Sequence, residues 1–132
     1  MRFLLDTNTV SDLIRNPRGQ VARRISEVGE RNVCTSIVVA AELRFGAKRR
    51  GSPRLTAHLE SVLDILDVLP LEAPADAVYG DVCAHLEKTG QPIGANDLLI
   101  AAHALSLDYT IVTSNEREFS RIGELRIENW LR

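Results

Sequence analysis

Three acidic side chains stand where the surrounding sequence is apolar. Asp6 directly follows the apolar run Phe3–Leu5. Glu42 and Asp97 have mostly apolar residues, and no cation, at the positions three and four away that are neighbours on a helix. An isolated ionised carboxylate in apolar surroundings is so costly that it normally protonates, pairs or coordinates a metal. The three acids therefore predict a shared site for a hard divalent cation, Mg²⁺ or Mn²⁺, which binds oxygen ligands.

Each acid taken alone also has a structural explanation. Asp6 can cap the first helix, Asp97 can be an acid of a helix first turn, and Glu42 can meet an arginine from elsewhere in the fold. Asp81 has similar apolar neighbours, together with His85, and is not assigned to the site. The joint pattern, and not any single acid, favours a functional site.

Composition limits the size of the fold and the kind of partner. A chain of 132 residues, 45% hydrophobic and 26% charged, suits one core, so residues 1–132 are expected to form a single domain. The net charge of −2 gives no global basic footprint, so contact with nucleic acid requires a local concentration of cations. One such cluster lies between residues 44 and 54 and contains Arg44, Lys48, Arg49, Arg50 and Arg54 without an acid. A solvated helix end has the same composition, because cations suit the carbonyl end of the helix dipole.

Cysteine and histidine usage indicates a protein without a disulfide or a structural zinc site. Cys34 and Cys83 are far apart and form no CxxC pair, and the three histidines lack zinc-ligand spacing. No run approaches the ~20 apolar residues that span a bilayer, and an acid at position 6 comes too early for a signal peptide. We expect a cytoplasmic protein without membrane contact.

Apolar runs alternate with longer helical patterns, which predicts an α/β fold. Strands are expected at 3–6, 32–35, 68–71, 109–113 and 125–127, and helices at 9–15, 20–28, 36–48, 52–66 and 74–90. Asn96 is expected to cap a further helix, which is apolar on all sides and should therefore be central and buried. Four or five parallel strands with helices on both faces place ligands at the carboxyl ends of the strands.

Several segments resemble the PIN domain, and most closely the VapC group of toxins from bacterial toxin–antitoxin pairs. They follow the family order over nearly the whole chain. The segments are Asp6-Thr7-Asn8, Ser36 with Glu42-Leu43, Pro92 to Asp97 with Ile100-Ala101-Ala102, Val112 to Asn115, and Ile127 to Trp130. The resemblance implies a three-layer α/β/α sandwich with a short, mainly parallel sheet of four or five strands.

The resemblance also implies a metal-dependent endoribonuclease that uses Mg²⁺ or Mn²⁺. By position, Asp6, Glu42 and Asp97 match the three principal acids of the family. Glu118 is the expected fourth acid, with Glu116 and Asn115 as alternatives. The supporting polar residues implied by the family motifs are Asn8, Asn96, Thr113 and Asn115.

The partners implied by the resemblance are an RNA substrate and an inhibitory protein. VapC-like toxins are held inactive by a VapB-type antitoxin, which also carries the DNA-binding part, so DNA contact would be indirect. Homodimers are common in the group. Some relatives cut transfer RNA, which makes transfer RNA the expected substrate by analogy.

Three other functions fit part of the sequence. Residues 6–10 resemble the opening of haloacid-dehalogenase-type phosphatases, but Asn8 stands where those enzymes need a second aspartate, and the chain lacks room for their cap. A phosphoacceptor receiver domain needs an aspartate after its third strand, and Val68–Leu71 supplies none. The third is a PIN-type binding protein without activity, against which the intact Asp6, Glu42 and Asp97 argue.

A first prediction concerns the basic cluster. If Lys48, Arg49 and Arg50 contact phosphates, replacing all three with alanine should weaken RNA binding and flatten its salt dependence, because fewer counterions are released. Metal binding should stay unchanged. Binding measured across a salt series tests this, and an unchanged slope would return the cluster to the role of a solvated helix end.

Overall fold

The sheet of this protein has five strands, all parallel, in the order β3-β2-β1-β4-β5. They belong to a computed structural model that describes residues 1–132. The strands are β1 Phe3–Leu5, β2 Val33–Ser36, β3 Asp67–Leu69, β4 Thr110–Val112 and β5 Ile127–Glu128. The expected α/β class is confirmed, with five strands and no antiparallel pair.

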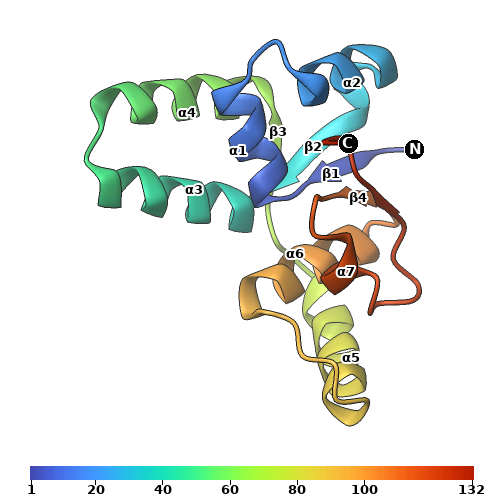
Figure 1. Cartoon of the computed structure of the whole chain (residues 1–132). Helices are drawn as coiled ribbons and strands as arrows, with labels where there is room; N and C mark the ends of the chain where they lie inside the picture. The colour runs from blue at the N-terminus through green and yellow to red at the C-terminus, as the bar shows by residue number, and fades with distance from the viewer.

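Seven helices connect the strands. They are α1 Thr7–Arg15, α2 Gln20–Val28, α3 Ile37–Arg50, α4 Pro53–Ile65, α5 Ala75–Lys88, α6 Ala95–Ser106 and α7 Glu116–Phe119, with a short 3₁₀ turn at Glu30–Asn32. Figure 1 shows α1 and α2 on one side of the sheet and α5 and α6 on the other. The pair formed by α3 and α4 extends to one side of the sheet. The layers are those expected of an α/β/α sandwich.

Several element ends differ from the sequence expectation, and two of the differences have a clear local cause. Helix α1 begins at Thr7, two residues early, because Asp6 caps it by accepting from the Thr9 amide. Strand β3 ends at Leu69, since the following Pro70 has no amide hydrogen for a ladder bond.

The cap expected from Asn96 is wrong. Helix α6 starts at Ala95 with Gly94 as N-cap, and Asn96 lies in the first turn. The Gly94 amide is satisfied by Glu118, 24 residues away, at 3.1 Å. The acceptor at the start of α6 is therefore the carboxylate of Glu118, whereas sequence patterns look for such an acceptor among residues next to the helix start.

The main core surrounds the central strand. Leu4 and Leu5 of β1, together with Ile111 of β4, are fully buried. Helix α6 buries six of its residues, as its apolar sequence predicts: Leu98, Ile100, Ala101, Ala102, His103 and Ala104. None of the helices combines the length and apolar character needed to cross a membrane.

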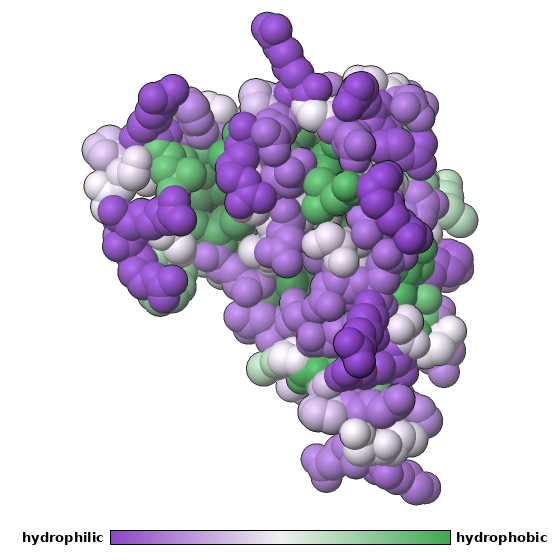
Figure 2. Space-filling view, viewed as in Figure 1, coloured by the Kyte–Doolittle hydropathy of each residue, from purple (hydrophilic) through white to green (hydrophobic).

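A second, smaller core joins α3 to α4. Its buried residues are Ala40, Ala47, Leu59 and Leu63. In the space-filling view, apolar residues show between these two helices, with hydrophilic side chains around them (Figure 2). The α3–α4 pair is thereby held as one unit that carries Glu42 at its inner end and the basic cluster at its tip.

The strand register brings three chain segments to one edge of the sheet. Leu5 pairs with Thr35 on one side and with Val112 on the other. The chain therefore leaves the carboxyl ends of β1, β2 and β4 at the same level, through Asp6, Ser36 and Thr113. The strand order changes direction between β1 and β4, and such a switch point is where open α/β sheets bind ligands.

Candidate acidic active site

Asp6 occupies the switch point directly after β1. Its amide donates to the Val112 carbonyl at 3.0 Å, and its Oδ1 accepts from the Thr9 amide at 2.9 Å. Only 3% of the residue is exposed. Burial raises its pKa, hydrogen bonds from Thr113 and Thr9 oppose the rise, and the negative charge of Glu42 adds to it. The structural explanation of Asp6 as an N-cap is therefore correct. Capping does not explain why a second acid, Glu42, lies close enough to raise the pKa of Asp6.

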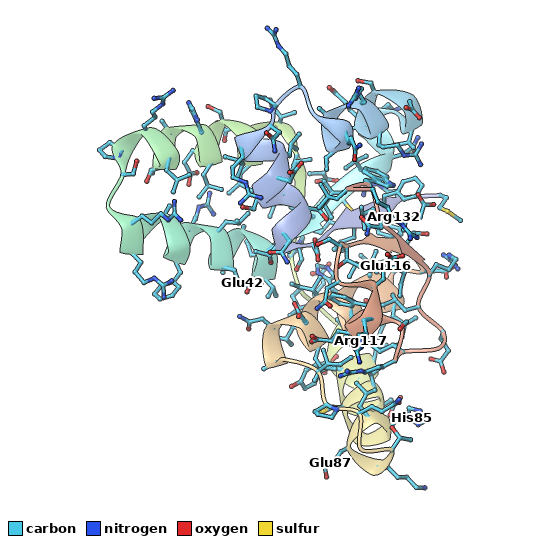
Figure 3. The ribbon with its side chains drawn as sticks, in the orientation of Figure 1. Glu42, His85, Glu87, Glu116, Arg117 and Arg132 are labelled. Atoms are coloured by element: carbon cyan, nitrogen blue, oxygen red, sulfur yellow. The ribbon has the colours of Figure 1, made fainter.

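Glu42 lies in the second turn of α3, half-buried. Its Oε1 accepts from the Thr7 hydroxyl at 2.7 Å, which ties α3 to the first residue of α1. No cation forms an ion pair with Glu42, so the structural explanation, an arginine from elsewhere, is wrong. In Figure 3 Glu42 lies near the end of α3 that meets α1.

Asp97 and Glu118 form a coupled pair of carboxyls. Burial, followed by the charge of Glu118 and smaller effects of Asp6 and Glu42, raises the pKa of Asp97 to about 6. Glu118 accepts from the Gly94 amide at 3.1 Å and from Asn115 Nδ2 at 3.0 Å. The Asn115 bond is the main reason why the pKa of Glu118 is lowered. A proton shared by this pair therefore resides on Asp97, as expected for close like charges in unequal surroundings.

The structure brings the four predicted acids to one place. They come from the N-cap of α1, from α3, from the first turn of α6 and from α7. The three others each raise the pKa of Asp97, so all four charges act at one point. Glu42, Asp97 and Glu118 are partly exposed, which leaves the cluster open to a large substrate.

Of the three candidates for the fourth acid, only Glu118 faces this cluster. Glu116 instead accepts from Arg132 at 3.0 Å and from Asn129 at 3.1 Å. In Figure 3 Glu116 and Arg132 lie close together, away from Glu42. Asn115 supports the site indirectly, as a donor to Glu118.

The other predicted polar residues divide into one that is buried beside Asp6 and two that are exposed. Thr113 is fully buried beside Asp6, and its hydroxyl accepts from the Asn115 amide at 2.9 Å. Asn8 and Asn96 are exposed and make no side-chain hydrogen bond. Sequence analysis missed Thr7 as the partner of Glu42, because a contact between residues 35 positions apart leaves no local pattern.

A comparison with known protein families decides among the candidate folds. The profile of the PIN domain matches residues 3–125. The chain belongs to the PIN-domain family. It is 38% identical to the tRNA(fMet)-specific endonuclease VapC of Shigella flexneri over 131 residues, 98% of each chain. It is 36% identical to Ribonuclease VapC2 of Haemophilus influenzae, covering 99% of each. The resemblance to the VapC group is confirmed.

Solved structures of VapC proteins share the whole fold of this PIN domain. The structure of DNA-bound VapBC from Salmonella typhimurium contains a chain that matches with a TM-score of 0.90 and 35% identity over 98% of both chains. VapBC2 from Rickettsia felis, bound to a DNA fragment from its promoter, matches with a TM-score of 0.89 and 33% identity over 98% of this chain and 99% of that one. These structures are toxin–antitoxin complexes, so the chain is a toxin-type PIN domain.

The receiver and phosphatase alternatives are wrong for this PIN domain. A receiver sheet has the strand order 2-1-3-4-5, whereas this sheet has 3-2-1-4-5. The segment after β3 contains no aspartate acceptor. The phosphatase reading loses its support because the family match covers the segment that suggested it.

One cation of the basic cluster has an acidic partner in the structure. Arg44 donates Nε and Nη2 to the two carboxylate oxygens of Glu60, at 3.0 and 2.8 Å. This ion pair lies at the surface, where such pairs are weak, so the RNA contact of Arg44 stays a prediction. Lys48, Arg49 and Arg50 are exposed in the last turn of α3, where Arg49 lies over the Phe45 ring at 5.5 Å. Arg54, at the start of α4, is exposed as well, so these four cations remain available to an anionic partner.

The donor set fits a hard cation held partly through water. All four side chains are carboxylates, which suit Mg²⁺ and Mn²⁺ better than softer metals. No three acidic, histidine or cysteine side chains converge closely enough to ligate one ion directly. Mg²⁺ commonly uses one or two protein carboxylates and keeps several waters, so this spacing suits it.

The raised pKa of Asp97 predicts a pH-dependent stability. An unfolded aspartate titrates near ~3.9, and the folded one at about 6, so between these values the folded state binds more protons. The free energy of unfolding should therefore fall as pH rises from ~4 to ~6. Because Asp97 is partly exposed, its contribution is about 1 kcal/mol after solvent screening.

Asp97→Asn should remove this contribution and unfold at a higher temperature than the wild type at pH 7 without divalent cations. Asp81→Asn, an exposed acid on α5, is the control and should follow the wild-type profile. Thermal unfolding from pH 4 to pH 7 measures both. An Asp97→Asn profile parallel to that of the wild type would contradict the assignment.

Proposed function

We propose that this chain is a metal-dependent endoribonuclease that acts as the toxin of a toxin–antitoxin pair. The observation that carries the proposal is a group of four carboxylates that includes Asp97, none of which forms an ion pair with a cation of the protein. Arg121 acts on Glu118 only through its charge, which helps to lower the pKa of that carboxyl. Mutual repulsion makes such a group costly, so a bound cation is the natural compensation. The ribonuclease names of the relatives point to RNA as the substrate.

The chain's own residues hold the reacting groups in place. Asp6 and Asp97 would hold the cation, and Glu42 and Glu118 would bind it through water. Thr7 fixes the carboxylate of Glu42, and the Gly94 amide and Asn115 fix that of Glu118. When bound, Mg²⁺ or Mn²⁺ lowers the pKa of a water towards neutrality and offsets charge on the phosphodiester oxygens. Because water attacks, the products carry 5′-phosphate and 3′-hydroxyl ends.

RNA is held by cations away from the acids, since the acids repel phosphate. Lys48, Arg49 and Arg50 at the tip of the α3–α4 pair supply that attraction. With three Phe, two Tyr and one Trp, the chain offers little stacking surface, so shape and backbone contacts select the RNA. Transfer RNA is the proposed substrate, because the relative from Shigella flexneri is named as specific for tRNA(fMet).

A VapB-type antitoxin is the proposed regulator, as the solved VapBC complexes suggest. An arginine of the antitoxin would pair with the acids in a charge-assisted contact and compete with cation and RNA. DNA would be reached only through the antitoxin. We further propose a homodimer that works in the cytoplasm, where its RNA substrate lies.

Metal dependence is the most direct test of the proposal. Millimolar Mg²⁺ or Mn²⁺ should raise the melting temperature by binding the folded state, and EDTA should abolish cleavage of transfer RNA. Thermal unfolding and mapping of RNA ends, with and without metal, measure the two effects. Cleavage that survives exhaustive chelation would refute metal dependence, and no cleavage under any condition would favour an inactive binding protein.

Substitution of Asp6 separates catalysis from capping. Asp6→Asn keeps an oxygen that can accept from the Thr9 amide but removes the charge, so the metal-free protein should be as stable as the wild type or more so. Cleavage should be lost. Asp6→Ala should also lose cleavage and, in addition, about 1 kcal/mol of stability with the cap. An active Asp6→Asn protein would leave Asp6 with its capping role alone.

A further inference from the structure

A buried histidine outside the acidic site connects three segments of the fold. His103 of α6 is 2% exposed, and its Nδ1 lies 2.8 Å from Ser36 Oγ at the end of β2. The carbonyl of Pro70, the residue after β3, also acts on the ring and opposes the lowering of its pKa by burial. The proposed mechanism gives this side chain no part, and a buried polar ring is costly unless it is fully hydrogen-bonded.

The neighbours of the ring favour one position for its proton. Nδ1 lies against Ser36, and the Pro70 carbonyl can only accept, so the tautomer that suits both carries its hydrogen on Nε2. In the neutral ring Nδ1 is then bare and accepts from the Ser36 hydroxyl. Ser36 Oγ in turn accepts from the Val38 amide at 3.0 Å, which caps α3. Burial lowers the pKa of His103, which favours this neutral form.

The hydrogen bond between Ser36 and His103 links α3 to α6. Each of these helices carries one acid of the site, at the same distance along the helix from this bond. Glu42 lies six residues after Ser36 on α3, and Asp97 lies six residues before His103 on α6. Each acid is therefore about 9 Å along its helix from the bond between Ser36 and His103. A change in that bond moves both helices relative to each other at the level of the site.

We propose that His103 is a positioning residue that, through Ser36, sets the spacing between α3 and α6 and thereby between Glu42 and Asp97. The inference rests on the proposed function, because the spacing of Glu42 and Asp97 matters only if both acids bind the same cation, directly or through its waters. Sub-ångström errors in such a constellation reduce turnover more than substrate binding.

Four variants test the link. His103→Leu removes both ring nitrogens, and Ser36→Ala removes the hydroxyl that His103 holds. His103→Asn retains an acceptor near the position of Nδ1 and so rescues the bond to Ser36. Val21→Ala is the control, because it removes buried volume from α2, which packs mainly against α1 and the 3₁₀ turn at Glu30–Asn32.

We expect His103→Leu and Ser36→Ala each to lower kcat for RNA cleavage at least tenfold with little change in KM. The Mg²⁺-induced rise in melting temperature should also shrink. The double variant should be no worse than either single one, because both break the same link. His103→Asn should stay within about threefold of wild type. Val21→Ala should keep the wild-type kcat and metal response at temperatures where it is folded.

A readout independent of cleavage keeps this inference separate from the proposed function. The amide NMR signals of α3 at Glu42 and of α6 at Asp97 should shift together in His103→Leu, or in Ser36→Ala if the former does not fold, and stay in place in Val21→Ala. Unchanged signals at both helices, wild-type kcat in a folded variant, or additive losses in the double variant would overturn it. A wild-type protein that cleaves no RNA would refute the proposed function alone.

Discussion

The central position of β1 in a parallel sheet is the constraint on which the site depends. Because β1 pairs with β2 on one side and β4 on the other, the chain emerges from all three strands at one edge. The order of strands reverses there, so no crossover helix covers that edge and side chains from both halves of the chain can meet. Asp6 is held at this point by its own amide, which donates to Val112 of β4.

The acids that gather at this edge are bound by neutral hydrogen-bond donors, and the only cation that acts on them, Arg121 near Glu118, forms no ion pair with them. The Thr7 hydroxyl, the Gly94 amide and Asn115 bind the carboxylates and orient them. Such donors favour the charged form without occupying the site with a counterion. Repulsion remains, as the raised pKa of Asp97 shows, and it leaves the site in need of a positive charge from outside the chain. The repulsion among the acids is therefore consistent with the proposed binding of a divalent cation.

Cations of the protein are kept at a distance from the acids. Arg44, the cation of the cluster nearest to Glu42 in sequence, is paired with Glu60, which leaves Lys48, Arg49 and Arg50 at the far end of α3. The buried apolar contact between α3 and α4 makes that separation rigid. The exposed cations and the acid Glu42 are thereby placed on the same helix pair without neutralising each other.

Local sequence patterns were sufficient for the fold class, the approximate elements and the membership of Asp6, Glu42 and Asp97 in one site. These rest on periodicity, on turn and cap chemistry, and on the cost of placing an acid in an apolar segment, all of which are visible within a few residues. The same patterns misplaced the start of α6, because the acceptor for the Gly94 amide comes from α7.

Only the tertiary structure decided which further acid lies beside Asp97 and which cations have no acidic partner. Glu116 and Glu118 are alike in sequence, but two positions on one turn of helix point in different directions, and so one pairs with Arg132 while the other meets Asp97. Arg44 and Thr7 likewise have partners 16 and 35 residues away. A residue's chemical neighbours are set by chain segments that pack together, and single-sequence patterns report only the neighbours that the backbone of one element provides.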